Sequence, residues 1–453
     1  DAAPMQGYGQ IKEGGLLQHG YHKHHADLPQ FKIKLCTLDN QVNHFAYPVC
    51  HLTISGNVAD EELYIPIIKQ SKEVLSGLSA YAAGNLYVGD NKFGSIGNRC
   101  YVVSNKDYYL MPLSLVQLSK TAREKLIKAS QVENYEKVVK EHEEKKTLIA
   151  QGFEVVELLN QSQGDQNYNW TERRLFVHSV SYAKSQRNAL ERRLNKTSTS
   201  IAELSIRKQG KKVLETKKEY TEAINNLLTI NQVKDFIAFK IKQRKTTKII
   251  RAYGNRPERI EEQIHFEVSY WRKEAQIKDH KLLLGWQVYA TNAPKKLLPF
   301  EKCVWKYRYQ SNIESRFDDI RNKMTPLLPV FLQKDNRLAG LVNVLLLALK
   351  ICAMVEYKIA RALKDRKEQL KDVYEGNPKR GTTRPSAKRI FNAFEGISIS
   401  LIFTEKKFEF ALMTKLEPVQ LRILDLLGIN PEIYTELTAK IQMYFSSFQI
   451  TET

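Results

Sequence analysis

The sequence has few of the residues on which several common kinds of protein chemistry depend. Its five cysteines, among 453 residues, are odd in number, widely spaced and free of any CxxC pair. A disulfide framework and a cysteine-based zinc site are therefore not expected, and a reducing cytoplasm is the simplest location. The histidines between His19 and His25 have no partner cysteine and no HExxH spacing, so we interpret them as part of a polar loop.

Long apolar segments are also scarce. The one extended run, Leu338 to Val355, is interrupted by Asn343 and Lys350. It predicts a buried core helix rather than a membrane span. Because the sequence begins at Asp1 and not at a methionine, we expect it to be an N-terminally truncated piece of a longer protein.

Acidic residues are clearly outnumbered. The chain has 70 lysines and arginines against 50 aspartates and glutamates, which gives a formal net charge of +20. Such an excess favours a polyanionic partner, because nucleic acids and acidic membrane surfaces both attract clustered cations. Apolar residues at 42% and charged residues at 26% are typical of a globular chain with a sizeable core.

The spacing of β-forming segments predicts one sheet that is interrupted by a long insertion. Predicted strands cover residues 31–38, 45–55, 85–90, 108–113 and 282–289. The acidic residues Asp60 to Glu62, followed by apolar residues at helical spacing, predict a helix after the second strand. About 170 residues separate the last two strands, far more than an ordinary connection needs.

The insertion is predicted to be mainly helical. Residues 122–159 and 171–227 are highly charged, with apolar residues at helical intervals, and the polar stretch 161–168 between them predicts a loop. Trp271 and Trp286 are candidates for insertion beside DNA, although buried core positions are commoner for tryptophan.

Near the end of the insertion, five cations occur in ten residues with no acid among them. They are Lys242, Arg244, Lys245, Lys248 and Arg251. This stretch is the predicted phosphate-binding segment of the chain. The alternative is a solvated edge strand that its lysines protect from pairing with another chain.

The segment from Trp305 to Lys323 is the most informative one. On one continuous helix, Tyr307, Gln310, Glu314 and Arg321 would fall within an arc of roughly 60°. A phenol, an amide, a carboxylate and a guanidinium on one face suit a phosphodiester, because the carboxylate can hold a metal ion and the guanidinium can pair with a phosphate. The alternative is a solvated polar face.

This segment resembles the signature helix of the DDE transposases of bacterial insertion sequences, in the insertion sequence 4 superfamily. That helix carries Tyr, Arg, Glu and Lys at these offsets, and here Gln310 replaces the arginine and Arg321 the lysine. The form with Gln310, Glu314 and a following Phe317 is similar to the branch named for insertion sequence 1634.

The resemblance covers nearly the whole chain. Further matching stretches occur in the family's order: Asp27 to Lys32, Ser55 to Asn57, Val88 to Asp90, Gly285-Trp286, Thr291-Asn292 and Phe394 to Ile397. The resemblance implies an α/β fold with a ribonuclease H-like mixed sheet, a large mainly helical insertion and a C-terminal helical region. The implied domains are residues 1–113 (first part of the core), 114–281 (insertion), 282–365 (second part, with the Glu-bearing helix) and 366–453 (C-terminal helices with a short strand pair).

The resemblance also implies three catalytic, metal-binding acids. These are Asp1 on the opening strand, Asp90 after the fourth strand and Glu314 on the later helix. Asp27 remains a rival to Asp1, whereas a turn and a helix cap account for Asp39 and Asp60. Two Mg²⁺ ions, or Mn²⁺, about 3.5–4 Å apart would clamp the attacking and leaving oxygens, so that no covalent protein intermediate is needed.

The implied function is transposition. Such an enzyme cleaves DNA at the ends of an insertion sequence and transfers the strand, as a homodimer on double-stranded DNA in the cytoplasm, at the nucleoid, with no membrane partner. Tyr307, Gln310 and Arg321 are expected to contact DNA, as are the cations from Lys242 to Lys248. The alternatives are a catalytically inactive DNA-binding remnant and a general nuclease of the same fold.

Overall fold

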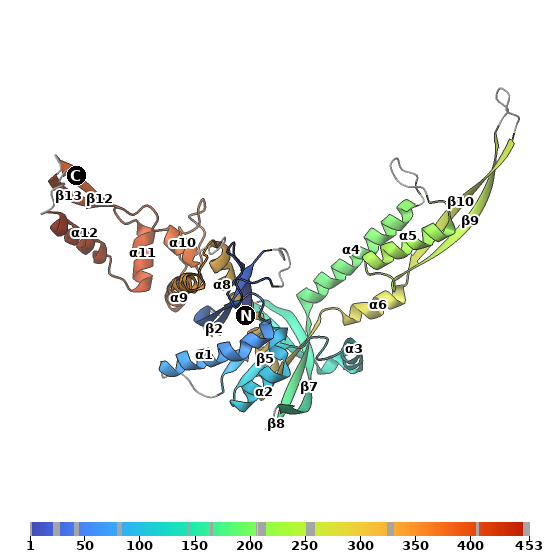
Figure 1. Cartoon of the computed structure of the whole chain (residues 1–453), viewed down its shortest axis with the longest axis horizontal. Helices are drawn as coiled ribbons and strands as arrows, with labels where there is room; N and C mark the ends of the chain where they lie inside the picture. Colours follow the sequence, from blue (N-terminus) through green and yellow to red (C-terminus); the bar gives the residue numbers. More distant parts are fainter. Residues whose placement is uncertain are drawn as a thin grey trace. The chain divides into compact units, whose positions relative to one another are not determined.

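The computed structural model of the chain is a mixed α/β structure (Figure 1). It describes residues 2–20, 28–39, 45–78, 84–142, 145–163, 166–204, 206, 214–250, 259–323, 330–404 and 407–446. Asp1, Asp27 and Arg251 lie outside these residues. The chain divides into two compact units. The first unit comprises Asp1–Tyr109, Gln161–Tyr168 and Trp305–Thr453, and the second comprises Leu110–Asn160 and Asn169–Val304.

The first unit opens with an antiparallel meander of three strands. They are β1 (Ala2–Gln6), β2 (Gln30–Asp39) and β3 (Ala46–Ser55), paired in that order. A short 3-10 turn, η1 (Asp60–Leu63), then leads into helix α1 (Tyr64–Gly77). The two predicted strands and the predicted helix are thus confirmed. Asp60 does not cap the helix, because the residue before η1 is Ala59 and no side-chain cap is present.

Alternation along β2 gives the meander two different faces. The odd-numbered residues Phe31, Ile33 and Leu35 are buried in a core cluster that also holds Ala3 and Met5 of β1. This cluster extends to residues that follow Glu314 and to helix α9 (Asp335–Arg366). On the even-numbered face, α1 packs against β2 and β3. Both faces are therefore covered, and the lysines of β2 become buried.

Two further strands of the first unit follow α1. Strand β4 (Leu86–Val88) is followed by η2 (Asn91–Gly94) and α2 (Ile96–Ser104), and Tyr108 at the start of β5 (Tyr108–Pro112) donates to the Asn85 carbonyl at 2.8 Å. Buried Asp107 fixes this register, because it accepts from the Asn85 amide at 3.0 Å and pairs with Lys72 at 2.8 Å. The division between the units falls inside β5.

In the second unit, β5 pairs with β11 (Trp286–Thr291), as expected for residues 108–113 and 282–289, but the further strands that this unit adds to the sheet were not predicted. The prediction of one sheet for all five strands is wrong, because β2 and β3 belong to the separate three-stranded meander. Helix α3 (Lys120–Ala129) and turn η3 (Val132–Asn134) precede its other strands. The strand order is β5-β11-β8-β7-β6, from β11 (Trp286–Thr291), β8 (Gln166–Ser179), β7 (Lys145–Gln163) and β6 (Glu136–His142).

The helix predicted over residues 122–159 is therefore wrong beyond Ala129. Of the loop predicted over 161–168, residues 161–163 and 166–168 belong to β7 and β8, and residues 164 and 165 lie outside the described residues. In β7, residues 155–162 alternate between half-buried and exposed, which is the period of a strand and not of a helix.

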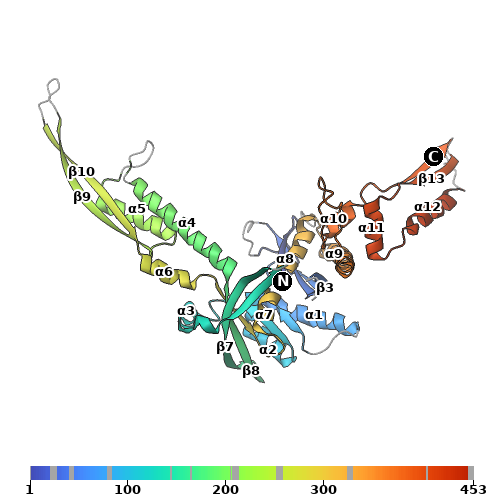
Figure 2. The same ribbon diagram turned by 180° about the vertical axis from the view of Figure 1, so that it is seen from behind.

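The rest of the second unit is a helical pair beside a long two-stranded ribbon. Helices α4 (Val180–Leu204) and α5 (Lys217–Ile230) confirm the second predicted helical stretch over residues 180–204 and 217–227. Its first residues belong to β8, and residues 205 and 207–213 lie outside the described residues. The ribbon consists of β9 (Ile237–Ile250) and β10 (Arg259–Arg272), and helix α6 (Glu274–Leu283) follows it. Figures 1 and 2 show α4 and α5 alongside the ribbon, which continues past the ends of both helices.

The segment predicted as one helix over 305–323 is broken. It forms α7 (Phe300–Arg308), α8 (Ser311–Asp318) and a π-helical turn, η4 (Asp319–Lys323). At the break, the Gln310 amide donates to the Tyr307 carbonyl at 3.1 Å, so a tighter turn interrupts the α-helical pattern. Tyr307 and Glu314 therefore belong to different helices.

Helix α9 is long and apolar enough, by length and composition, to cross a membrane. A core helix meets the same criterion, and the buried residues of α9 recur along one side, from Leu338 to Leu363. They belong to two core clusters, whereas Val344, Leu347, Ile351 and Met354 are exposed, so the predicted burial holds for one side of α9 only. The C-terminal part adds α10 (Ala387–Asn392), the paired strands β12 (Ile399–Thr404) and β13 (Lys407–Met413), α11 (Pro418–Leu427) and α12 (Glu432–Phe445).

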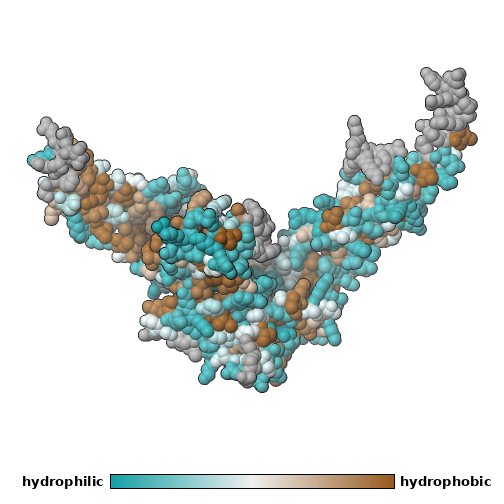
Figure 3. Space-filling view, in the orientation of Figure 1, coloured by the Kyte–Doolittle hydropathy of each residue, from teal (hydrophilic) through white to brown (hydrophobic). Residues whose placement is uncertain are grey.

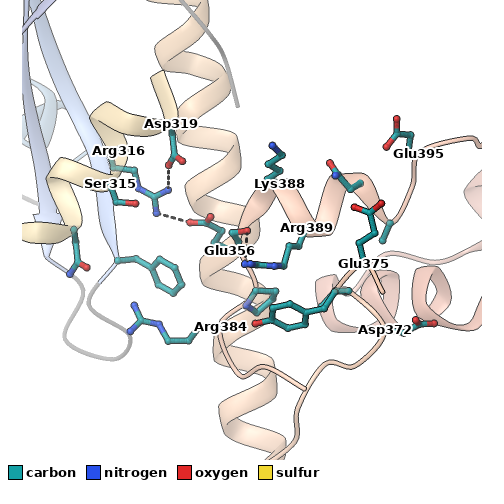
Figure 4. A pocket seen from close by; sticks show the side chains of 18 of the residues that line it. Ser315, Arg316, Asp319, Glu356, Asp372, Glu375, Arg384, Lys388, Arg389 and Glu395 are labelled. Atoms are coloured by element: carbon teal, nitrogen blue, oxygen red, sulfur yellow. Dashed lines mark hydrogen bonds and ion pairs between the residues drawn. The ribbon is translucent and has the colours of Figure 1, made fainter. Parts of the chain in front are cut away.

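A buried arginine connects α8 to the elements around it (Figure 4). Arg316, only 4% exposed, pairs with Glu356 of α9 at 2.6 Å and with Asp319 at 3.1 Å, and it donates to the Ala46 carbonyl at 3.0 Å. Glu356 in turn accepts from the Ala387 amide of α10 at 2.7 Å. Arg316 also lines a cavity of about 910 Å³, which Glu314 does not line.

We predict that Arg316→Met lowers the free energy of unfolding by about 3–5 kcal/mol, because it leaves two carboxylates without their buried partner. Urea denaturation followed by circular dichroism measures the effect. The matched control is Arg366→Met, which breaks an ion pair of similar length, 2.6 Å, to Asp425 at the surface. That change is expected to leave the stability nearly unaltered. Equal effects of the two substitutions would contradict a structural role for Arg316.

Candidate active site

Asp90 follows β4 at a point where the backbone passes close under two aromatic rings. Tyr64 and Phe93 stack with their centroids 4.7 Å apart. A Cβ atom on Gly89 would lie only 2.9 Å from the Phe93 Cβ and 3.0 Å from the Tyr64 Cε1. Glycine is therefore the residue that this close approach requires, and it places Asp90 directly beside the rings.

The Asp90 carboxylate is held through one of its two oxygens. The Tyr64 hydroxyl donates to Oδ1 at 2.6 Å, and the Lys92 amide donates to the same oxygen at 2.9 Å. Burial, reinforced by the Asp90 charge, raises the pKa of Tyr64 well above its usual range, so its phenol remains a donor. The other oxygen, Oδ2, has no hydrogen-bond partner among the residues that the structure describes.

A buried lysine lies on the other side of the Tyr64 ring. Lys34 of β2 is 1% exposed, and its Nζ is 3.3 Å from the ring centroid. Burial lowers the pKa of Lys34 to about 8, although the charges of Asp90 and Asp60 oppose this shift. Sequence reasoning missed Lys34. The alternation of lysines with apolar residues was visible in the sequence, but the covering of the lysine face by α1 was not.

Asp60 has a structural partner of its own. Lys32, two residues before Lys34, pairs with Asp60 at 2.8 Å and donates to the Val58 carbonyl at 2.7 Å. This ion pair ties the even-numbered face of β2 to the chain that enters α1. It gives Asp60 a role other than that of a metal-binding acid.

The pKa of Tyr307 responds to both of the predicted carboxylates, Asp90 and Glu314. Burial, followed by the charges of Asp90 and Glu314, raises the pKa of Tyr307 to about 12. Both carboxylates therefore lie close enough to the phenol to disfavour a negative charge on it. Glu314 itself is exposed on α8 and has no ion-pair or hydrogen-bond partner within the described ranges. The charges of Asp90 and Glu314 thus both reach the Tyr307 phenol.

Arg321 and Gln310 take positions that a single continuous helix did not predict. The Arg321 guanidinium is half-buried and donates from Nη2 to the Pro4 carbonyl of β1 at 3.2 Å. This bond joins the end of the Glu314 segment to the opening strand. Gln310 is half-buried in the turn between α7 and α8, where its backbone carbonyl accepts from the Ile313 backbone amide at 3.0 Å.

The remaining predicted site residues lie elsewhere. Lys242, Arg244 and Lys245 are on β9 in the second unit, and Lys248 is on the same strand with a side chain outside the described set. Within the described ranges, no group of three or more His, Cys, Asp and Glu side chains converges. Asp1, the third predicted ligand, lies outside those ranges.

No protein-family model matches the chain, and a search of curated proteins finds no matching sequence. The assignment of a function therefore depends on the residues and contacts described above.

We predict that Lys34→Met raises the free energy of unfolding at pH 7 by about 3 kcal/mol, because the folded state no longer holds a buried ammonium. Below pH 8, Lys34 is charged in both the folded and the unfolded state, so the full cost of burying its ammonium lowers the stability of the folded state. Between about pH 8 and pH 10.5 the folded lysine is neutral while the unfolded one is still charged. The stability of the unmodified protein therefore rises with pH, and its difference from the variant shrinks.

Urea titrations of both proteins from pH 7 to pH 10.5 measure this difference. Lys69→Met, on the exposed side of α1, is the control and should show no such convergence. A variant that is less stable than the unmodified protein at pH 7 would contradict the predicted penalty.

Proposed function

We propose that the protein is a DDE transposase with a ribonuclease H-like core, which uses divalent metal ions to cleave and transfer DNA strands. The order of elements supports this proposal. Three antiparallel strands, α1, β4, α2 and β5 come first, and the carboxylate-bearing helix α8 follows only after a large insertion. The single observation that carries the proposal is that Asp90 and Glu314, far apart in the chain, both act on the Tyr307 phenol.

The donor atoms near Tyr307 fit a hard divalent cation. Asp90 keeps Oδ2 without a partner, and the Glu314 carboxylate has none within the described ranges. Carboxylate oxygens of this kind are the ligands that Mg²⁺ and Mn²⁺ accept. Asp90 and Glu314, with Asp1 as the third acid, would hold the ions. When bound, the metal supplies Lewis-acid activation of the attacking oxygen and stabilises the leaving oxygen.

The surrounding side chains orient these acids and the DNA. Tyr64 and the Lys92 amide hold Asp90 so that Oδ2 stays available. Tyr307 remains protonated at neutral pH, so it can donate a hydrogen bond to a phosphate oxygen. Gln310 can add an amide contact. Arg321 donates a hydrogen bond to the Pro4 carbonyl and so holds β1 next to the Glu314 segment. Its guanidinium would also place positive charge beside the DNA.

The partner that we propose is double-stranded DNA, both at the ends of the mobile element and at the target. A net charge of +20 supports a polyanionic partner. Action on two DNA ends accounts for the proposed homodimer, and the cytoplasm, at the nucleoid, is the corresponding location. The alternatives are an inactive DNA-binding remnant, which would not cleave with any metal, and a general nuclease, which would cleave without regard to end sequence.

We predict that Asp90→Asn and Glu314→Gln each abolish Mg²⁺-dependent cleavage and leave DNA affinity nearly unchanged. Each substitution removes a charged ligand but keeps the shape of the side chain. Cleavage of labelled duplexes that carry the element's ends, with binding measured in parallel by anisotropy, separates the two effects. Glu301→Gln, at an exposed position of α7, is the control and should cleave normally. Full cleavage by either site variant would remove the assignment.

The first acid is tested by a pair of substitutions. We predict that Asp1→Asn abolishes cleavage whereas Asp27→Asn does not, because β1 begins at Ala2 and its Pro4 carbonyl accepts from Arg321 of the Glu314 segment. Isothermal titration with Mn²⁺ should also show weaker metal binding for Asp1→Asn only. The opposite pattern would assign the role to Asp27.

A further inference from the structure

The β9–β10 ribbon has two chemically different faces. Its strands are antiparallel and in register, with Lys242 opposite Glu267, so directly opposed residues share a face. One face carries Phe239, Ile241 and Val268, which pack in a core cluster with residues of α4 and α5. We call this the helix face, and the opposite one the open face.

The open face combines cations with an exposed aromatic ring. Lys240, Lys242 and Arg244 follow one another along it at every second residue, about 6.8 Å apart, and all three are exposed. Within the described residues, Lys240 and Lys242 have no ion-pair partner, whereas Arg244 pairs with Glu267 at 3.1 Å. Trp271 is on the same face and is 52% exposed.

Trp271 does not occupy the core position that is commoner for tryptophan. The residue opposite it is Ala238, and its neighbour along that face of β10 is Ser269, so two of its neighbours on the sheet are small. Trp286 does occupy a core-like position, since it contacts Tyr135, Phe153 and His178. A large exposed ring beside unpaired cations is typical of a surface that binds a ligand with both charge and apolar area.

Where α4 and α5 do not cover it, the helix face carries a paired lysine and exposed apolar side chains. There Lys245 pairs with Glu262 at 3.4 Å, and Ile249, Ile260 and Ile264 are exposed around it. The cations that were predicted as one phosphate-binding cluster are therefore divided between two faces. Lys242 and Arg244 are on the open face, and Lys245 is on the other.

We infer that the open face of the ribbon binds duplex DNA, with Lys240, Lys242 and Arg244 contacting phosphates and Trp271 packing against the sugar and base edges of a groove. This inference rests on the proposed function. A two-stranded ribbon fits the major groove, and strands of 14 residues extend about 45 Å, more than one turn of duplex. Figure 3 shows mainly hydrophilic residues along this part of the chain.

The chemistry of the open face favours a duplex over a single strand. Proteins that bind unpaired strands stack successive bases on several aromatic rings. The open face has one exposed tryptophan and then a row of cations, which matches phosphates at regular intervals and one apolar contact. Contacts of this kind position a protein on DNA without reading its sequence.

The charge contribution is tested with two single variants of the full chain, three residues apart on opposite faces. Affinity for a fluorescent 30-base-pair duplex is measured by anisotropy, without divalent metal, over a range of salt concentrations. For Lys242→Gln we expect the slope of log K against log salt to fall by about 0.9, the value of one lost phosphate contact. For Lys245→Gln we expect no change of slope. Equal slopes for the two variants would overturn the inference.

The role of Trp271 is tested by fluorescence and affinity. Adding duplex should quench the tryptophan emission of the full chain. The quenching should disappear in Trp271→Phe and persist in Trp286→Phe, and Trp271→Ala should weaken binding roughly tenfold. Quenching that survives in Trp271→Phe would overturn the assignment. A single strand of equal length that competes as well as the duplex would overturn the choice of partner.

Failure of this inference can be told apart from failure of the proposed function. Binding of Lys242→Gln and Trp271→Ala is measured without divalent metal, so the result does not depend on the cleavage that the Asp90 and Glu314 site would carry out. If these variants bind normally while Asp90→Asn loses cleavage, only the ribbon inference falls. If they bind weakly while Asp90→Asn still cleaves, the proposed function falls and the ribbon surface remains.

Discussion

The hydrogen bond from the Tyr64 hydroxyl to Asp90 is the contact on which the arrangement of the site depends. It joins the first residue of α1 to the end of β4, and it leaves one carboxylate oxygen available. The ring of the same tyrosine covers the Lys34 ammonium. One side chain therefore orients the carboxylate and holds a compensating cation nearby. Because β2 supplies Lys34, the meander is joined electrostatically to the site as well as by packing.

Two charged residues of α8, Glu314 and Arg316, differ in burial and in pairing. Arg316 is buried, and two carboxylates and a backbone carbonyl satisfy its guanidinium, so its contacts stabilise the fold. Glu314, two residues earlier, is exposed and has no partner within the described part of the chain. The buried Lys34 costs stability, whereas the exposed Glu314 carboxylate is solvated and carries no such cost. The contrast separates a structural charge on α8 from a carboxylate that is free to bind in the proposed function.

The sequence predicted local features well where one pattern was dominant. Strands β2 and β3 of the meander followed from segments rich in β-formers, whereas β1 did not. The close approach at Gly89 gives the physical reason for the glycine between Val88 and Asp90. Lys34 was missed because its burial depends on α1 covering the strand from a distant position in the chain. The break at Gln310 was missed because the residues of this segment favour a continuous helix. Helix α8 begins only at Ser311, and its contacts with β3 and η4 cannot be seen in the sequence.

The ribbon shows why a count of charges is a poor guide to a binding surface. Lys242 and Lys245 would be neighbours on one side of a helix, since residues three apart share a face there. On a strand the same spacing places them on opposite faces, and β10 supplies glutamates that the sequence of β9 did not reveal. Only part of the positive charge of this segment therefore points toward any one partner. The salt dependence of DNA binding should follow the number of cations on the open face, not the number in the segment.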